Sequence, residues 1–592
     1  MPKEQKYIVV CAPSGSGLRG AIEKLRNILP DSDVQDVEDI LCESRQAEED
    51  LSTAGVSRPL NAPKWPEMYD ITWNLSRSQI VDLWEDAVSE ALYRLKKSEK
   101  GIKILSCHLI YYGGRRDEFY SPINANLLER NLFRPSHILL LIDDVYDMYL
   151  RLSDEKALFD PKVRIPSIQG RIREDEGIDI RTLASEQLVS LCLEWQVGVM
   201  TNLLSWRHLE IVIAEKLATQ LKTNFLVWGT KQLTHAAALW LQEDRPVAEY
   251  LSHPISRPRR KFRETKKWHE VVGQFNELQA EFLKNELVCI MPPAIDEYRI
   301  RRKRRSSTLA LREPILEERW PLPAKMDFIM YSRHGATSDV NHEMVMAFKK
   351  WHFESRRFID LEPAPNSILC ERADAVLRGF ERQIELQISS RDHMFVSWSS
   401  GILIFRPLFL EGTYSSGVTA EIVHWKLLAK ANREKRAAFI HFDEDVNALL
   451  HYHQSDSERA GVMRLEIRDK LIEIISHDSR ISSRNAEFVI DHIKKGKPSE
   501  MLDQAPIPPK HIEEIGSKFS EYSKIAEKSW LLEKLTGHDI GIEEIPEKQI
   551  AVWVFKNKDD FKSRYSVIAN FLKNGAKPAD SSLQRFEMIL SK

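Results

Sequence analysis

Two segments of this chain carry residue types and spacings that suit phosphate binding or covalent chemistry. In segment 12–19, APSGSGLR, a glycine-rich turn joins an apolar strand pattern to a helical one. Bare backbone N–H groups at such a helix start can hold a phosphate. In the second segment, an apolar strand pattern leads through a loop to Gly417 and then to Glu421, at a predicted helix start. The helix dipole favours an ionised carboxylate there, and such a group can act as a nucleophile.

Segment 12–19 departs from the G-x-x-x-x-G-K-[ST] pattern of phosphate-binding loops at three positions. Ala12 replaces the first glycine, Leu18 the lysine and Arg19 the hydroxyl residue. Without the lysine and the hydroxyl, phosphoryl transfer should suffer greatly, although Arg19 can supply a charge from one residue further on. The predicted nucleotide-binding residues of this turn are Gly15, Ser16, Gly17 and Arg19.

Asp143 and Asp144 follow an apolar strand pattern at the place where a Walker B carboxylate holds Mg²⁺ through water, so we predict that both bind nucleotide. A helix N-cap is the alternative. With Asp147 the run also spells D-D-x-x-D, the diphosphate-magnesium motif of terpene synthases. Those enzymes are all-helical and carry a second metal motif, whereas this chain alternates strand and helix patterns.

Two basic runs lie further along the chain. Residues 253–267 include Arg257, Arg259 and Arg260, which could close over phosphates as a kinase lid does. A solvated loop explains this run about as well. Of residues 299–305, five are Arg and one is Lys, which suits a nucleic-acid backbone. Aromatic residues are absent from that run, so a charged helix face between domains is favoured.

The element pattern indicates an α/β fold class: two doubly wound parallel-sheet domains followed by a mostly helical C-terminal region. In the first half, strands are predicted at 7–11, 102–112, 138–142 and 224–228, with a helix at 209–221. In the second half, strands are predicted at 326–331, 357–361, 401–405, 437–442 and 549–555, with helices at 342–353, 372–388 and 419–430. A basic, proline-bearing stretch separates the halves. The predicted divisions are residues 1–310, 324–480 and 481–592.

The order and placement of the first group of motifs resemble those of P-loop nucleotide kinases with a degenerate Walker A loop. The resemblance covers about the first 300 residues. It implies that this part binds ATP or another nucleotide with Mg²⁺, without efficient kinase activity. A true nucleoside or nucleotide kinase and a structural remnant remain alternatives.

The segment 391–425, followed by the strand pattern AAFIHFDED, is similar to the nucleoside 2-deoxyribosyltransferase family. That family shares its architecture with TIR-type NAD glycohydrolases. The resemblance rests on strand, loop and the spacing Gly417-x-x-x-Glu421, and it covers about one fifth of the chain. It implies that Glu421 is the nucleophile that attacks the anomeric carbon and that Asp392 positions the nucleoside. A first-turn acid without catalytic function is the alternative for Glu421.

The substrate pocket is expected at the carboxyl ends of the strands of this second domain, as in other doubly wound sheets. Arginines there would suit a phosphorylated substrate, and a glycine lets the chain pass close to the sugar. The predicted substrate-binding residues are Tyr331, Ser332, Arg333, Gly335, Arg406 and Gly417.

The composition of the chain excludes several classes of protein. The 592 residues are 43% hydrophobic and 29% charged, which excludes a mainly disordered protein. Lys and Arg total 85 against 88 for Asp and Glu, so no global field points to nucleic acid. The six cysteines show no C-x-x-C spacing, and no metal site is predicted. Without a signal pattern or an apolar stretch of ~20 residues, the expected location is the cytoplasm, with no membrane contact.

A kinase-like and a deoxyribosyltransferase-like module in one chain resemble bacterial antiphage defence proteins. The resemblance implies a nucleotide sensor that cleaves the N-glycosidic bond of a nucleoside, nucleotide or NAD, with a homo-oligomer or partner protein as possible assemblies. A catalytically inactive nucleotide-binding scaffold is the main alternative, supported by Leu18 and opposed by Glu421.

Overall fold

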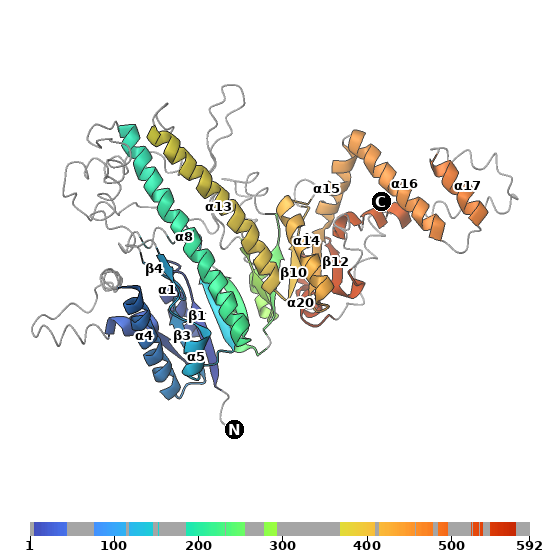
Figure 1. The fold of residues 1–592 in the computed structure, drawn as a ribbon. Helices are drawn as coiled ribbons and strands as arrows, with labels where there is room; N and C mark the ends of the chain where they lie inside the picture. Colours follow the sequence, from blue (N-terminus) through green and yellow to red (C-terminus); the bar gives the residue numbers. More distant parts are fainter. Residues whose placement is uncertain are drawn as a thin grey trace, which may run out of the picture. The chain divides into compact units, whose positions relative to one another are not determined.

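The computed structural model describes residues 5–43, 76–113, 118–145, 148, 152, 185–230, 232–244, 246–254, 277–292, 368–408, 414–455, 457–477, 483–494, 523, 525–527, 529–531, 533–536 and 545–575. The chain forms two units, each interrupted in sequence. Unit 1 comprises Met1–Pro246 and Met291–Trp398, and unit 2 comprises Val247–Ile290 and Ser399–Lys592. Both units are α/β, and each holds a five-stranded parallel sheet (Figure 1).

The sheet of unit 1 has the order β2-β3-β1-β6-β7. Its strands are β1 (Lys6–Cys11), β2 (Ser32–Asp36), β3 (Ile102–Cys107), β6 (His137–Ile142) and β7 (Asn224–Gly229). β1 and β6 lie inside the sheet, and their apolar runs are buried because helices cover a parallel sheet on both faces. The strand predictions for this half are confirmed, with one difference. The predicted strand 102–112 ends at Cys107, and Tyr111–Gly113 forms β4, antiparallel to β5 (Glu118–Tyr120).

Helices of unit 1 connect these strands. α1 (Leu18–Ile28) follows β1. α4 (Arg77–Lys97) packs on β2 and β3, and a capping box at Ser76 stabilises its first turn. The shorter helices of this unit are α5 (Ala125–Arg130) and α9 (Thr234–Gln242).

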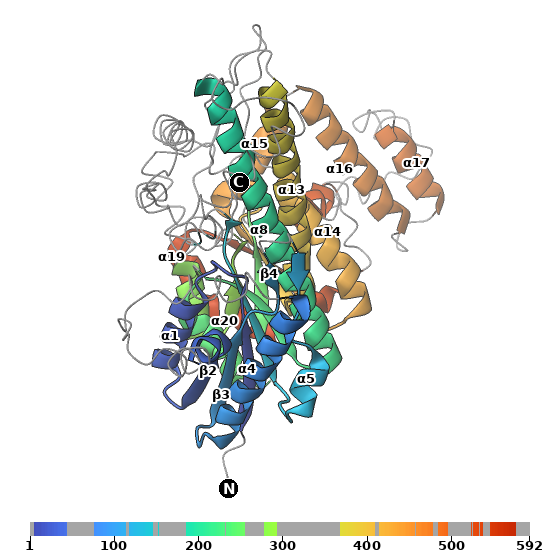
Figure 2. The same cartoon turned by 60° about the vertical axis from the view of Figure 1, so that its left-hand side comes forward.

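Two long helices of unit 1 run side by side (Figures 1 and 2): α8 (Ser185–Leu221) and α13 (Ile368–Trp398). Trp398 Nε1 donates a hydrogen bond of 2.7 Å to Glu215 Oε1, and Gln387 Nε2 donates one of 3.0 Å to the carbonyl of Leu204. α13 contains the predicted helix 372–388. The predicted helix thus lies in unit 1, although it was predicted to belong to the second domain.

The sheet of unit 2 has the order β12-β11-β10-β8-β9. Its strands are β8 (Ala248–Ser252), β9 (Val288–Ile290), β10 (Gly401–Phe405), β11 (Arg436–Phe442) and β12 (Ile550–Phe555). The predicted strands at 401–405, 437–442 and 549–555 are confirmed. Strands β8 and β9 precede the predicted boundary near residue 310, yet β8 pairs with β10, and β9 pairs with β8 at the edge of the same sheet. The structural division therefore differs from the predicted one, because parallel pairing joins strands that are distant in sequence.

The remaining elements of unit 2 are mostly helices. They are α14 (Ser416–Ala431), α15 (Asp443–Gln454), α16 (Ser457–His477), α17 (Ser483–Lys494), the short 3₁₀ turn η6 (Glu547–Gln549), α19 (Lys558–Lys562) and α20 (Tyr565–Asn574). Within residues 481–592, the part that the structure describes is mostly helical, as predicted, but it also supplies β12, which pairs with β11 in the sheet. The predicted elements at 326–331, 342–353 and 357–361 lie outside the described residues.

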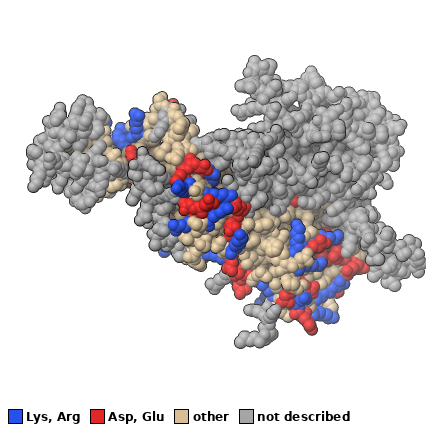
Figure 3. All heavy atoms as spheres, turned by 180° about the vertical axis from the view of Figure 1, so that it is seen from behind, with Lys and Arg blue, Asp and Glu red and all other residues tan. Residues whose placement is uncertain are grey.

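The described surface carries both positive and negative side chains. On the face that Figure 3 shows, Lys and Arg side chains lie among Asp and Glu side chains over the described surface. This mixture agrees with the near balance of charge in the sequence. Among the described residues, no helix is both long and apolar enough to cross a membrane.

A buried carboxyl group at the amino end of the unit 2 sheet has consequences for stability. Glu249 of β8 is fully buried, and neither carboxylate oxygen has a hydrogen-bond partner among the described residues. Burial raises the pKa of Glu249 well above its usual value, although Lys435 and Arg436 act in the opposite direction. The folded protein therefore retains a proton that the unfolded chain releases.

We expect this difference to make Glu249→Gln stabilising at neutral and alkaline pH. Above the unfolded pKa near 4.5, the folded state binds more protons than the unfolded state, so the wild-type free energy of unfolding falls as pH rises. The variant lacks this dependence. Its melting temperature should exceed that of the wild type by a few degrees at pH 8, and the two should converge toward pH 4.5. Glu434→Gln, at an exposed position before β11, should show no such difference; an equal shift in both variants would contradict the assignment.

Candidate functional site

The glycine-rich turn of unit 1 lies at the point where the chain changes direction across the sheet. β1 has β3 on one side and β6 on the other. In open α/β sheets, ligands bind beyond the carboxyl ends of the strands at such a switch point. Gly15 and Gly17 have φ values of 81° and 79°, a region that glycine adopts without strain, and Gly17 is the N-cap of α1. The predicted placement of the turn is thus confirmed.

Other residues of unit 1 pack closely around part of this turn. Ser16 is fully buried, and its Oγ has no hydrogen-bond partner among the described residues. A Cβ atom on Gly15 would lie 2.8 Å from Leu152 Cγ and 2.9 Å from the carbonyl oxygen of Met148. Arg19, the predicted substitute cation, is half exposed, and its Nη2 lies 3.2 Å from Asp39 Oδ1. It therefore pairs with a carboxylate in this structure.

Asp143 and Asp144 follow β6, which is adjacent to β1, so they lie at the same edge of the sheet as the turn. Both are fully buried. Asp143 Oδ1 accepts a hydrogen bond of 2.8 Å from the backbone N–H of Asp144. Buried Arg207 of α8 donates one of 3.0 Å from Nη1 to the carbonyl of Asp143. These contacts fix the backbone at the end of β6.

A buried histidine that was not among the predicted site residues, His108, directly follows β3 and supports the turn. His108 Nε2 lies 2.8 Å from Glu38 Oε1, and Nδ1 contacts the carbonyl oxygen of Ala12, the first residue of the turn. Both partners are acceptors, so both ring nitrogens must carry protons. Burial lowers the pKa of His108, but Glu38 outweighs this effect and raises the pKa to about 9. An imidazolium ion therefore stabilises the start of the turn.

In unit 2 the switch point lies between β8 and β10, and it is there that Glu421 lies. From β8 the chain passes to β9 on one side and later to β10, β11 and β12 on the other. Tyr250 donates a hydrogen bond of 2.7 Å to Glu421 Oε1, and Ser252 donates from Oγ to Oε2. Tyr250 and Ser252 project on one face because side chains alternate along a strand. Glu421 is only 7% exposed, so two hydroxyl groups hold a nearly buried carboxyl.

The position of Glu421 in α14 differs from the prediction. The helix begins at Ser416, and the Oγ of the N-cap Ser415 accepts from the backbone N–H of Val418 at 3.3 Å. Glu421 thus lies in the second turn, and the first turn contains no acidic residue. The helix dipole is weaker there, so the hydrogen bonds from β8 position the group instead.

Sequence reasoning missed Tyr250 and Ser252 because it took residues 326–331 as the first strand of this domain. Tyr331, Ser332, Arg333 and Gly335, like Arg257, Arg259, Arg260 and Asp147, lie outside the described residues. In the structure, β8 is the first strand of the unit 2 sheet. The run AEYLS has no regular alternation of polar and apolar residues, so this pattern gave no strand signal there.

The other predicted residues of the second site have different surroundings. Arg406, with φ of 47°, pairs through Nη2 with Asp445 at 2.8 Å and also with Glu444, both at the start of α15. Gly417 lies within α14, and a Cβ atom there would meet nothing within 4 Å, so no close approach requires a glycine. Asp392 lies on α13 in unit 1, where it pairs with Arg391 at 3.2 Å, whereas Glu421 belongs to unit 2.

No cluster of His, Cys, Asp and Glu suited to a metal ion occurs among the residues that the structure describes. Comparison with known proteins leaves the family open. No protein family model matches this chain, and no curated protein matches it.

Proposed function

We propose that unit 2 cleaves an N-glycosidic bond and that Glu421 is the nucleophile. The observation that carries the proposal is the buried carboxyl of Glu421, held by Tyr250 and Ser252 at the switch point of a parallel sheet. Enclosure by hydroxyl donors keeps one geometry for attack, and ligands of such sheets bind at this edge. The resemblance to nucleoside 2-deoxyribosyltransferases supports the same residue.

The carboxylate of Glu421 is the group that acts in both steps of the proposed reaction. An oxygen of Glu421 attacks the anomeric carbon of the sugar, the carbon–nitrogen bond breaks, and the base leaves with the bonding electrons. A purine or pyrimidine then takes a proton from solvent, whereas the nicotinamide of NAD leaves as a neutral molecule. The carboxylate charge stabilises the oxocarbenium-like transition state. Water then attacks the same carbon and gives up a proton to solvent, the glycosyl–oxygen bond breaks, and the Glu421 carboxylate is restored. The substrate class is a nucleoside, a nucleotide or NAD.

A second candidate function is nucleotide binding by unit 1, with ATP or another nucleotide and Mg²⁺ as the ligand. Positive φ values at Gly15 and Gly17 and the buried hydroxyl of Ser16, at the start of an 11-residue helix, favour it. Phosphoryl transfer is disfavoured because Leu18 stands where a lysine would contact the phosphates. In this proposal, unit 1 senses a nucleotide and controls the glycosidase activity of unit 2. The proposed biological role is antiphage defence in the cytoplasm.

The test is incubation of the purified full chain with NAD, nucleosides and (deoxy)nucleotides, with and without ATP and Mg²⁺, with released base measured by chromatography. Base release supports the glycosidase, and dependence on ATP supports the sensor. Absence of release from every compound in both arms would favour the alternative, a nucleotide-binding scaffold. Transfer of labelled phosphate to a nucleoside would instead favour a kinase.

Tyr250→Phe is expected to lower kcat for base release about ten- to a hundredfold. The change removes the hydroxyl that donates to Glu421 Oε1, and hydrogen bonds to charged groups contribute about 1.5–3 kcal/mol. Tyr250 is fully buried and phenylalanine keeps its ring, so the melting temperature should change little. Steady-state kinetics measure the effect. A variant with full kcat would remove the tyrosine from the proposed site.

A further inference from the structure

The connection from β10 to α14 leads directly to the helix that carries Glu421. Its described ends are residues 406–408 and 414–415. Leu408 is 1% exposed, and Tyr414 immediately precedes Ser415, the N-cap of α14. The contacts of Leu408 and Tyr414 therefore influence where α14 begins.

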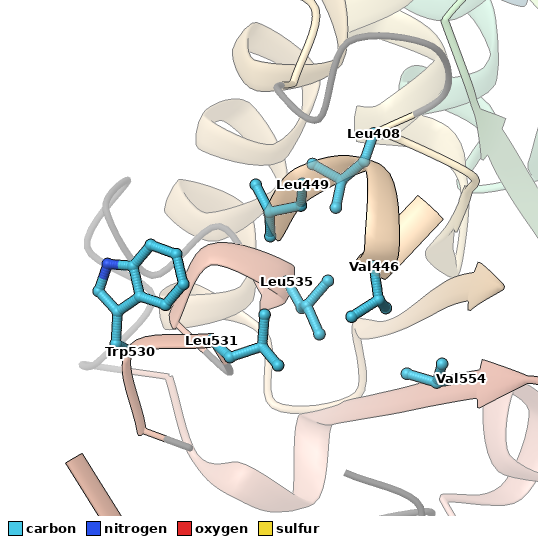
Figure 4. Packing of buried hydrophobic residues seen from close by; sticks show 7 residues of the cluster. All are labelled: Leu408, Val446, Leu449, Trp530, Leu531, Leu535 and Val554. Carbon is cyan, nitrogen blue, oxygen red and sulfur yellow. The ribbon is translucent and has the colours of Figure 1, made fainter. Parts of the chain in front are cut away.

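Both residues pack against one part of the C-terminal region, which we name segment 529–536 for its described residues 529–531 and 533–536. The cluster consists of Leu408, Val446, Leu449, Trp530, Leu531, Leu535 and Val554 (Figure 4). Tyr414 packs against this cluster. Leu531 and Leu535 are fully buried. Apolar burial on this scale stabilises the contact between the connection and the segment.

Two hydrogen bonds accompany this apolar packing. The hydroxyl of Tyr414 donates to the carbonyl oxygen of Leu535. His441 Nε2 of β11 donates to the same oxygen at 2.7 Å, because a carbonyl oxygen only accepts. Burial lowers the pKa of His441 to about 4, so the ring is neutral and Nε2 carries its one proton. One carbonyl group of segment 529–536 thus receives a donor from the sheet and a donor from the residue before the cap of α14.

The segment itself is anchored on α16. Trp530 Nε1 donates to Glu466 Oε2 at 2.6 Å, and Lys534 Nζ lies 3.4 Å from Glu466 Oε1. Lys470 of α16 pairs with Glu533 at 2.7 Å. Segment 529–536 therefore has fixed contacts with α16, with the sheet and with both described ends of the connection.

We propose that segment 529–536 is a built-in strap that positions Glu421 by holding Leu408 and Tyr414, and that Tyr414 is the positioning residue through which it acts. The inference rests on the proposed function of Glu421. It gives the C-terminal region a role in the same reaction: the region sets the start of α14 and with it the angle at which the carboxyl meets the sugar.

The test compares full-length wild type with Tyr414→Phe by base-release kinetics and by hydrogen exchange of the backbone around residues 414–421. Loss of one hydrogen bond should lower kcat about three- to tenfold with KM nearly unchanged, and should speed exchange in this stretch. Tyr93→Phe, an exposed hydroxyl on α4 in unit 1, should change neither value. Glu466→Gln, at a half-exposed anchor, should give a smaller effect in the same direction and serves if Tyr414→Phe folds poorly.

Exchange distinguishes failure of the strap from failure of the proposed function. If wild type releases no base, the glycosidase proposal fails, and unchanged exchange in Tyr414→Phe would overturn the strap independently. If wild type is active, an unaltered kcat overturns the positioning role even when exchange is faster. A lower kcat with unaltered exchange also overturns it, since Tyr414 would then act directly on substrate.

Discussion

Glu421→Gln is expected to lower base release at least about a thousandfold. The change keeps the size of the side chain and the possibility of contacts with Tyr250 and Ser252, but it removes the charge that attacks the anomeric carbon. Loss of a nucleophile in covalent catalysis typically costs at least this much. Chromatography of the released base, with the substrate panel at saturating concentration, measures the result.

A matched control for this variant lies on the same strand as its partners. Glu249 is also a buried glutamate, but it precedes Tyr250 and so lies on the opposite face of β8. Glu249→Gln should therefore retain wild-type kcat at neutral pH. Retained activity in Glu421→Gln would refute the nucleophile assignment, and loss in both variants would indicate damage to the sheet.

Gly401→Ala is expected to destabilise unit 2 by about 3 kcal/mol or more. A Cβ atom at this position would lie 2.5 Å from the backbone oxygen of Arg436 and 2.5 Å from Glu249 Oε2. The carboxylate can move, but the oxygen belongs to the neighbouring strand β11, so the ladder between β10 and β11 must open. Urea or thermal unfolding followed by circular dichroism measures the change.

The control for this substitution is another glycine of unit 2. Gly461 lies within α16, and a Cβ atom there would meet nothing within 4 Å. Gly461→Ala should stabilise the protein by about 0.5–1 kcal/mol, since alanine favours the helix. Equal stability of Gly401→Ala and wild type would mean that β10 and β11 are not packed as described.

These stability effects also bear on the proposed activity. Gly401 begins β10, which pairs with β8 and precedes the connection to α14. Unfolding of unit 2 would separate Tyr250 from Glu421, so Gly401→Ala should lose activity in proportion to the fraction unfolded. Glu421→Gln should lose activity while it remains folded. Unfolding measurements on both variants separate the two causes.

Local patterns were sufficient to predict the strands β1, β3, β6, β7, β10, β11 and β12 and parts of the helices α1, α8, α13 and α14, but not β2, β8, β9 or α4. Apolar runs at β1, β6, β10 and β11 are buried strands because their residues contact helices on both faces of a sheet. The turn with Gly15 and Gly17 was recognisable because its backbone needs glycine there. The spacing to Glu421 was likewise a local feature, and in the structure this residue contacts Tyr250 and Ser252 of β8.

The sequence alone indicated the strands β1, β3, β6, β7, β10, β11 and β12, the glycine turn and Glu421 as a candidate; only the tertiary structure decided which strands share a sheet and which side chains meet. Glu421 contacts Tyr250 and Ser252 at separations of 171 and 169 residues, and His108 contacts Ala12 at a separation of 96. Parallel pairing imposes no local pattern that names the partner strand. The first strand of unit 2, the unit to which Asp392 belongs and the strap at Tyr414 therefore required the folded chain.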